Sequence, residues 1–267
     1  LSFSLAMGVN VMPAFAAQVQ GPPYEDMSRV YLTKNYELAN TGTLSPKETF
    51  TFTIDPGTVT DASEGIEAAD YMPSVGDVTY QQGEAGSANK TRQIEIQLPK
   101  YDSVGVYTYI IHEVAGNSAG VIEQDGKLRI AAVHTEDPES TGEGKKDDFD
   151  NLYSAGELEV HKDVEGIMGN KDKYFEFTVQ LTGEEGKTYQ DSYAITGGSY
   201  DANPASIEIK PGETTKATFY LKAGDTIHIE NLPYGVEYKV SETPVADYVT
   251  TETGTEGEVD EAVEQAN

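Results

Sequence analysis

Residues 148–164 read D-F-D-N-L-Y-S-A-G-E-L-E-V-H-K-D-V, and they join the end of one β-strand pattern to the start of another. Apolar side chains share one strand parity on each side of the Ala155-Gly156 step, with Phe149 and Tyr153 before it and Leu158, Val160 and Val164 after it. A period of two is typical of half-buried antiparallel strands. The stretch therefore predicts a boundary between two β-domains.

The same alternation continues in both directions from this stretch. In the first half it appears around 30–38, 50–54, 94–98 and 107–111, and in the second half around 175–181, 207–209, 219–221, 227–229 and 236–240. The 17 Tyr, 26 Gly and 12 Pro favour strands and turns over helices. We expect an all-β protein of two β-sandwich domains, with no helix longer than a turn or two. The acidic tail 253–267 could be a loop or a short helix.

The charge balance excludes some partners. A formal net charge of −28 argues against nucleic acid and anionic membranes, and favours a solvated exterior. No calcium-loop motif occurs, and the four His residues have no metal-like spacing: His112, His134, His161 and His228. We therefore expect no metal site and no cofactor.

The N-terminus resembles a secretory signal. Leu1 to Phe15 is mostly apolar, and Ala14-Phe15-Ala16 is a small-x-small cleavage site, so we predict cleavage after Ala16. The predicted organisation is a signal remnant and N-terminal arm over 1–23, domain one over 24–154 and domain two over 155–267. With no Cys, a secreted protein must resist unfolding without disulfides.

Five polar side chains share strand parity with apolar neighbours, so they are predicted to face the cores: Lys34, Glu113, Asn151, Lys162 and Glu242. Alone, each would be a strand-edge or turn residue with its polar end in water. They recur at matched spacing, however. Glu113 follows Lys34 by 79 residues (113 − 34), and Glu242 follows Lys162 by 80 (242 − 162).

A buried Lys, Glu and Asn together can carry out one particular reaction. Burial lowers the pKa of a lysine and raises that of a glutamic acid, so both can be neutral. A neutral amine is a nucleophile, and a protonated carboxyl can polarise an amide carbonyl and transfer protons. Attack on the Asn side chain expels ammonia and leaves an isopeptide bond. The triad Lys34, Glu113 and Asn151 is thus a predicted self-crosslinking site.

Domain two has only two members of such a triad. Asn151 follows Glu113 by 38 residues (151 − 113), and the same step from Glu242 reaches 280, beyond the last residue. We expect that the Asn partner of Lys162 is not in this chain and that domain two is truncated. Asn267 lacks the F-x-N-x-Y setting of Asn151 and is not favoured.

Several of these segments resemble one known family. The K-N-Y opening, the I-I-H-E and V-S-E-T-P strand ends and the segment 148–164 resemble Gram-positive sortase-assembled major pilins, of the streptococcal T-antigen type with pilin isopeptide-linkage domains. The similarity covers about residues 27 to 250. It implies two tandem immunoglobulin-like domains related to the B-type repeats of collagen adhesins (Cna B-type). It also implies a Lys34–Asn151 bond assisted by Glu113, and Lys162 with Glu242 in domain two.

The resemblance further implies a cell-surface shaft subunit that sortase joins to identical subunits and finally to peptidoglycan. Lys145 and Lys146 lie where the family places its intersubunit lysine, although they are also explained as a solvated basic pair. The family's Leu-Pro-x-Thr-Gly sorting signal, hydrophobic span and basic tail do not occur in the sequence given.

Two other functions stay open at this point. One is a stalk or binding domain of a wall-anchored adhesin, which could share the fold and the bonds. The other is a secreted enzyme with paired carboxylates, but no G-x-S-x-G, H-E-x-x-H or phosphate-loop motif occurs. We expect no catalysis beyond the protein's own crosslinking.

Overall fold

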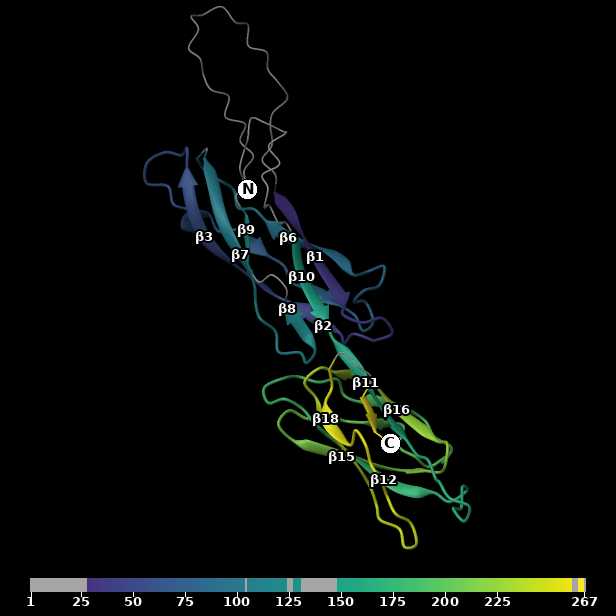
Figure 1. Ribbon diagram of the computed structural model, residues 1–267. Helices are drawn as coiled ribbons and strands as arrows, with labels where there is room; N and C mark the ends of the chain where they lie inside the picture. Colours follow the sequence, from purple (N-terminus) through teal and green to yellow (C-terminus); the bar gives the residue numbers. More distant parts are fainter. Residues whose placement is uncertain (1–27, 104, 124–126, 131–147, 261–263, 267) are drawn as a thin grey trace, which may run out of the picture.

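The computed structural model describes residues 28–103, 105–123, 127–130, 148–260 and 264–266. These residues form two groups of β-sheets that lie end to end in an elongated molecule (Figure 1). We call the group formed by residues 28–153 domain one and the group formed by residues 155–266 domain two. The predicted signal segment, Lys145, Lys146 and Asn267 lie outside the described residues.

Domain one is built around its first strand. The main sheet has the order β4 (Ser74–Val75), β6 (Thr91–Gln97), β1 (Arg29–Leu38), β10 (Asp148–Tyr153) and β8 (Val121–Glu123). The smaller sheets are β3 (Phe52–Thr60), β7 (Val106–Glu113) and β9 (Lys127–Ile130), and β2 (Glu48–Phe50) with β5 (Val78–Tyr80). Because β1 pairs in parallel with β10, the first and last strands lie side by side.

Domain two repeats this plan. One sheet has the order β14 (Ser206–Ile207), β13 (Tyr193–Gly197), β16 (Thr226–Pro233), β11 (Ala155–His161) and β19 (Glu264–Ala266). The other has the order β15 (Thr214–Leu221), β12 (Phe175–Thr182), β17 (Glu237–Glu242) and β18 (Glu256–Glu258). Here too the first strand, β11, pairs in parallel with the last, β19.

The cores confirm the predicted alternation. Burial alternates residue by residue along β7 and β12. In domain one Tyr36, Phe50 and Tyr80 pack edge to face, with ring centroids 5.2 to 5.9 Å apart, a favoured geometry for aromatic pairs. The all-β, tandem immunoglobulin-like architecture is therefore confirmed. Among the described residues the one helical element is a 3-10 turn at Ala68–Tyr71.

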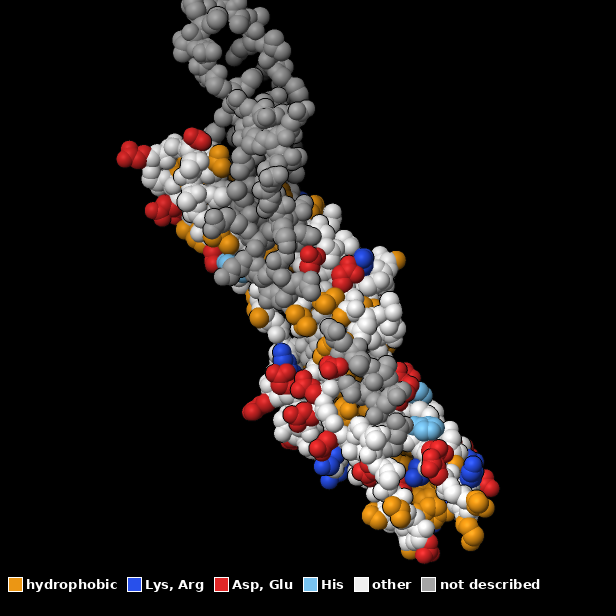
Figure 2. All heavy atoms as spheres, viewed as in Figure 1, with side chains coloured by type: hydrophobic (Ala, Val, Ile, Leu, Met, Phe, Trp, Pro, Cys, Tyr) orange, Lys and Arg blue, Asp and Glu red, His pale blue; other side chains and the backbone are white. Residues whose placement is uncertain are grey.

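The acidic tail differs from the sequence expectation. It was predicted as loop or short helix, but it contributes β18 and β19. β18 pairs with β17, and β19 pairs with β11. Tertiary pairing thus outweighs the weak strand propensity of the tail's Glu and Gly residues. Elsewhere, acidic side chains are spread over the visible faces of both domains (Figure 2), as expected for a solvated exterior.

The junction between the domains is short and hydrogen-bonded. Only Ser154 separates β10 from β11. Its N–H donates to Gly120 O at 2.8 Å, and its carbonyl accepts from Tyr234 N at 3.2 Å. Nearby, Ala119 N donates to Thr188 O and Thr188 N to Asn117 O, both at 2.8 Å. These backbone contacts tie the domain-one loop 117–120 to domain two, and they predict a stiff junction.

Gly120 is the position of this junction that is most sensitive to substitution. It has φ +76°, and a Cβ there would lie 2.6 Å from Ser154 O and 2.9 Å from Tyr153 Cε2. We expect Gly120→Ala to lower the free energy of unfolding by roughly 2 kcal/mol and to increase proteolysis at the junction. Thermal unfolding and limited proteolysis measure the two effects.

Gly65→Ala is the matched control, because Gly65 has φ +83° but a Cβ added there would meet no atom within 4 Å. The Gly65→Ala variant therefore has only the free-energy cost of placing a non-glycine residue at positive φ. Equal losses of stability for the two variants would show that the junction contact contributes nothing.

Candidate functional site

The three predicted domain-one residues meet in the core. Lys34 lies on β1, Asn151 on the adjacent β10 and Glu113 at the end of β7. Parallel pairing sets Asn151 opposite Tyr36, two residues beyond Lys34, so the two side chains share a face. The exposed fractions are 0% for Lys34, 4% for Asn151 and 8% for Glu113. All three are therefore withdrawn from water, as their strand parity predicts.

The lysine amine is in direct contact with the amide. Nζ of Lys34 donates a hydrogen bond to Oδ1 of Asn151 and lies 3.4 Å from Oε2 of Glu113. It also donates to the backbone carbonyls of Asn35 and Phe149, each at 3.2 Å. The amine, the amide and the acid are thus close enough for one proton-coupled reaction.

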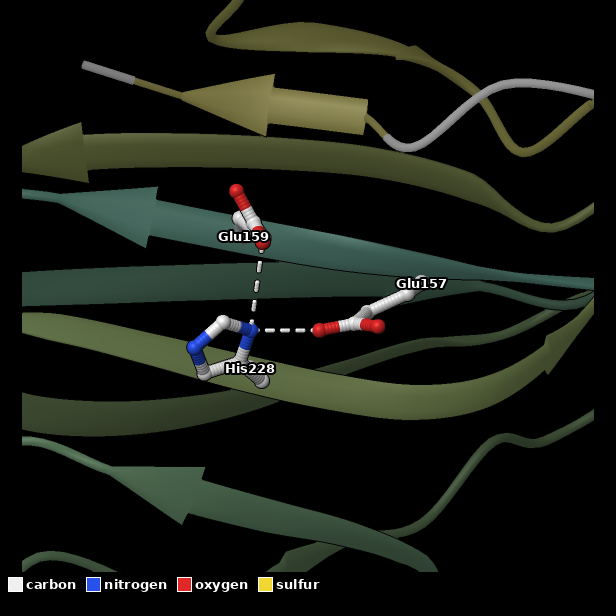
Figure 3. Close-up of side chains that lie close together, drawn as sticks. All are labelled: Glu157, Glu159 and His228. Atoms are coloured by element: carbon white, nitrogen blue, oxygen red, sulfur yellow. Dashed lines mark hydrogen bonds and ion pairs between the residues drawn. The ribbon is translucent and has the colours of Figure 1, made fainter. Parts of the chain in front are cut away.

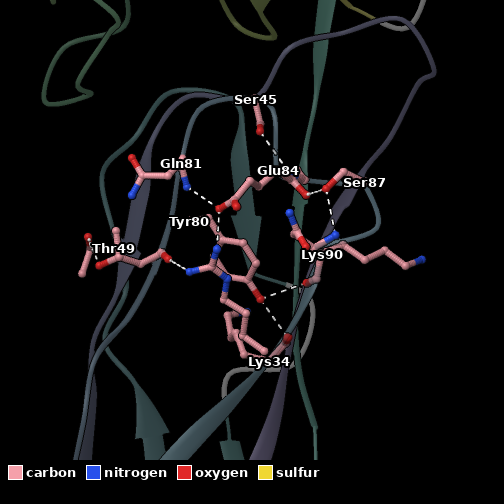
Figure 4. Close-up of polar contacts among 12 residues, drawn as sticks. Lys34, Ser45, Thr49, Tyr80, Gln81, Glu84, Ser87 and Lys90 are labelled. Carbon is pink, nitrogen blue, oxygen red and sulfur yellow. Dashed lines mark hydrogen bonds and ion pairs between the residues drawn. The ribbon is translucent and has the colours of Figure 1, made fainter.

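Aromatic rings enclose these groups. Nζ of Lys34 lies 4.2 Å from the centroid of the Phe50 ring, and Phe52 packs edge to face on Phe149 at 5.2 Å. The Tyr80 hydroxyl donates to Lys34 O at 2.8 Å and to Lys90 O at 2.9 Å, which fixes β1 at this point (Figure 4). Burial raises the pKa of this hydroxyl above its usual range, so it remains a neutral donor.

Such an enclosure favours attack of the Lys34 amine on the Asn151 side-chain amide. A site without water favours the neutral forms of an amine and a carboxylic acid, and it excludes the water that would compete as a nucleophile. Fixing the reacting atoms in contact also removes the entropic cost of bringing them together. The arrangement can therefore support condensation of an amine with a carboxamide.

Domain two contains a corresponding pair. Nζ of Lys162 donates to Oε2 of Glu242 at 2.7 Å and lies 4.5 Å from the centroid of the Phe175 ring. The Lys162 side chain is 14% exposed and that of Glu242 is 4% exposed. Lys162 directly follows β11, and the pair lies at a cavity of about 1300 Å³ that residues 160–169, 240–242 and 246–253 help to line.

Sequence reasoning found the polar residues but not their surroundings. Parity identifies which side chains face the core, whereas the Phe50 ring over Lys34 depends on how one sheet packs on the other. The F-x-F sequence at 50–52, within the predicted strand around 50–54, was the available signal.

Two family models match consecutive parts of the chain. One is described as a Spy0128-like isopeptide containing domain and matches residues 30–154. The other is described as a domain of unknown function (DUF7601) and matches residues 156–267. A curated pilin of Streptococcus pyogenes serotype M1 is 26% identical over 253 residues, covering 89% of this chain and 74% of the relative. The chain is therefore similar to a streptococcal pilin over most of its length, and its residues 30–154 match the isopeptide containing domain.

Two other comparisons show the same fold and one partial sequence match. A solved major pilin of S. pyogenes (T3.2) has the same fold, with a TM-score of 0.53 at 22% identity, covering 90% of this chain and 95% of that one. A pilus tip adhesin of S. pyogenes is 34% identical, but over only 36% of this chain and 13% of the adhesin.

The pilin is therefore a structural subunit of a cell-surface pilus shaft, not an enzyme acting on an external substrate. Among its described residues, no helix is long and apolar enough to cross a membrane.

Proposed function

We propose that the pilin strengthens the shaft by forming an isopeptide bond between Lys34 and Asn151, with Glu113 as the assisting acid. The observation that carries this proposal is the buried contact of Lys34 Nζ with Asn151 Oδ1, beside Glu113 Oε2 at 3.4 Å. The family description of residues 30–154 as isopeptide-containing supports it.

The reaction balances without an external reagent. Neutral Nζ of Lys34 attacks Cγ of Asn151, and the Glu113 carboxyl donates its proton to the developing oxyanion. When the intermediate collapses, the C–N bond to the amide nitrogen breaks. Glu113 relays the amine proton to this nitrogen, which leaves as ammonia, and recovers the hydroxyl proton as the amide carbonyl re-forms. No oxidation occurs, and the acid is regenerated.

For domain two we propose the same bond in a polypeptide that continues past residue 267. Strand pairing sets Leu158 opposite Glu264, so the residue opposite Val164 is 270 (264 + 164 − 158). Val164 lies two residues after Lys162, as Tyr36 does after Lys34. This register supports position 270 for the Asn partner, rather than the 280 that spacing predicts.

The bond would help each subunit to resist tension along the shaft. Lys34 and Asn151 are 117 residues apart and lie on the first and last strands of domain one. Tension applied at the two ends of the domain passes through these strands, so a covalent tie between them carries the load without separating the sheet. Unlike a disulfide, the bond resists reduction.

We further propose that sortase joins identical subunits through Lys145 or Lys146 and finally links the polymer to peptidoglycan. We expect co-expression of the complete polypeptide with its sortase to give a ladder of covalent multimers on denaturing gels. Lys145→Arg with Lys146→Arg should abolish the ladder, because arginine offers no nucleophilic amine. Lys100→Arg, at an exposed domain-one lysine, is the control and should leave the ladder intact.

The alternatives give different results. A monomeric wall-anchored adhesin stalk would give a single covalently anchored species and no ladder. A ladder that survives the double substitution would instead assign the linkage to another lysine.

A further inference from the structure

Three side chains with metal-ligating atoms converge on the outer face of the β11–β16 pair in domain two (Figure 3). They are Glu157 and Glu159 on β11 and His228 on β16. Nδ1 of His228 contacts Oε1 of Glu157 and lies 3.4 Å from Oε1 of Glu159. The three ligand atoms all lie within 4.8 Å of one another.

The backbone holds two of these residues in register. Glu159 pairs directly with His228, and the flanking pairs are Leu158 with Ile229 and Val160 with Ile227. These four apolar neighbours are 0–1% exposed, so the strands that carry the ligands are fixed by the core beneath them.

The third residue lies on the same strand face by ordinary alternation, because Glu157 precedes Glu159 by two positions on β11. The β11–β16 register shifts between Gly156 and Leu158, and Asn231 on β16 has φ +57°. The extra residue of this β-bulge is on β16, beyond the His228–Glu159 pair, so the pairing that holds His228 beside Glu159 stays regular. Glu157 therefore points toward the same imidazole nitrogen as Glu159, from two positions earlier on the same strand.

We propose that Glu157, Glu159 and His228 bind one divalent transition-metal ion of the Zn²⁺ class. Zinc takes histidine nitrogen and carboxylate oxygen at about 2.1 Å in a tetrahedron, so two ligand atoms lie about 3.4 Å apart. Nδ1 of His228 and Oε1 of Glu159 already have this separation. One imidazole nitrogen with two oxygens suits Zn²⁺ or Cu²⁺ better than the all-oxygen preference of Mg²⁺ and Ca²⁺.

Charge and access support a cation at this point. Two adjacent carboxylates repel each other, and a protonated imidazole neutralises only one of their two charges, whereas a divalent ion neutralises both. The net charge of −28 adds a long-range attraction for cations. The three side chains are 27–34% exposed, which leaves an entry path and room for water as a fourth ligand.

A bound metal would link two strands that other contacts hold only by hydrogen bonds and packing. β11 is the first strand of domain two and directly follows the junction, and β16 is its antiparallel neighbour. A ligand that binds only the folded state stabilises it in proportion to the logarithm of its concentration. The ion would therefore be a reversible crosslink between β11 and β16 at the start of domain two.

Calorimetric titration of the full chain with ZnCl₂ tests the proposal. We expect one saturable equivalent and an upward shift in the domain-two melting temperature. Both should be lost in His228→Gln and in Glu157→Gln. Co²⁺ should give the visible absorption of tetrahedral coordination in the parent chain and not in these variants. Circular dichroism of the metal-free variants checks that each one folds.

His161→Gln is the matched control. His161 lies on the same strand, is half-buried, and its Nδ1 bonds Thr226 Oγ1 at 2.8 Å. It should keep the full zinc equivalent. The proposal is overturned if the parent chain shows no saturable binding, if folded His228→Gln binds as the parent does, or if His161→Gln loses the equivalent. The first result would leave an ion pair between His228 and the two carboxylates.

Discussion

Asn151→Ala is expected to retain the full mass of the uncrosslinked polypeptide, whereas the parent chain should be lighter by one ammonia. Lys34→Ala should likewise show no loss of ammonia, because each substitution removes one of the two atoms that the bond joins. The closed loop spans 117 residues, and treating it like a disulfide gives a stabilisation of about 5 kcal/mol from chain entropy. Both variants should therefore unfold at lower temperature and be digested faster. Intact-mass spectrometry and thermal unfolding measure the two effects.

Asn35→Ala provides a control on a neighbouring amide. Asn35 Nδ2 donates to Asp150 Oδ1 at 2.8 Å, and its side chain is on the opposite face of β1 from Lys34. This variant should still lose one ammonia. An unshifted mass in the parent chain would contradict the domain-one bond. A polypeptide extended past residue 267 with Asn at 270 should lose two ammonia molecules.

Glu113→Gln is expected to slow crosslinking by roughly 10²- to 10⁴-fold, the usual contribution of a positioned general acid–base group. The Gln side chain keeps the shape of Glu113 but cannot donate and recover the proton that the reaction requires. Newly folded protein sampled over time should thus show the uncrosslinked mass persisting. Mass spectrometry of samples quenched during refolding measures the rate.

Glu84→Gln is a control for loss of a partly buried carboxylate. Glu84 binds Arg92 at 2.6 Å and takes no part in the Lys34 contacts. Its substitution should leave the crosslinking rate unchanged. A Glu113→Gln variant that crosslinks at the parent rate would remove the assisting role of Glu113 while leaving the bond itself intact.

The polar residues of the domain-one site could be predicted because they lie on regular strands. Parity alone decides which face a residue occupies, so Lys34 and Asn151 had to point where their apolar neighbours point. The same logic predicted the all-β fold and the boundary between the two domains.

The contacts that sequence reasoning missed depend on register between strands. His228 follows Glu157 by 71 residues, and no spacing rule brings them together. Their proximity follows from the pairing of β11 with β16 and from the shift near Leu158. The expectation of no metal site was drawn from the absence of a calcium-loop motif and from the spacing of the His residues, and neither criterion tests for cross-strand sets of ligands.

The single residue between β10 and β11 has a consequence for torsion. With only Ser154 between the strands, and with loop 117–120 hydrogen-bonded across the junction, neither domain can rotate freely about the chain axis. Side chains alternate along a strand, so inserting one residue would turn the β11 face over relative to β10. The angle between successive domains is thus set within each subunit. A shaft of such subunits would resist twisting as well as stretching, and its helical pitch would be determined partly at Ser154.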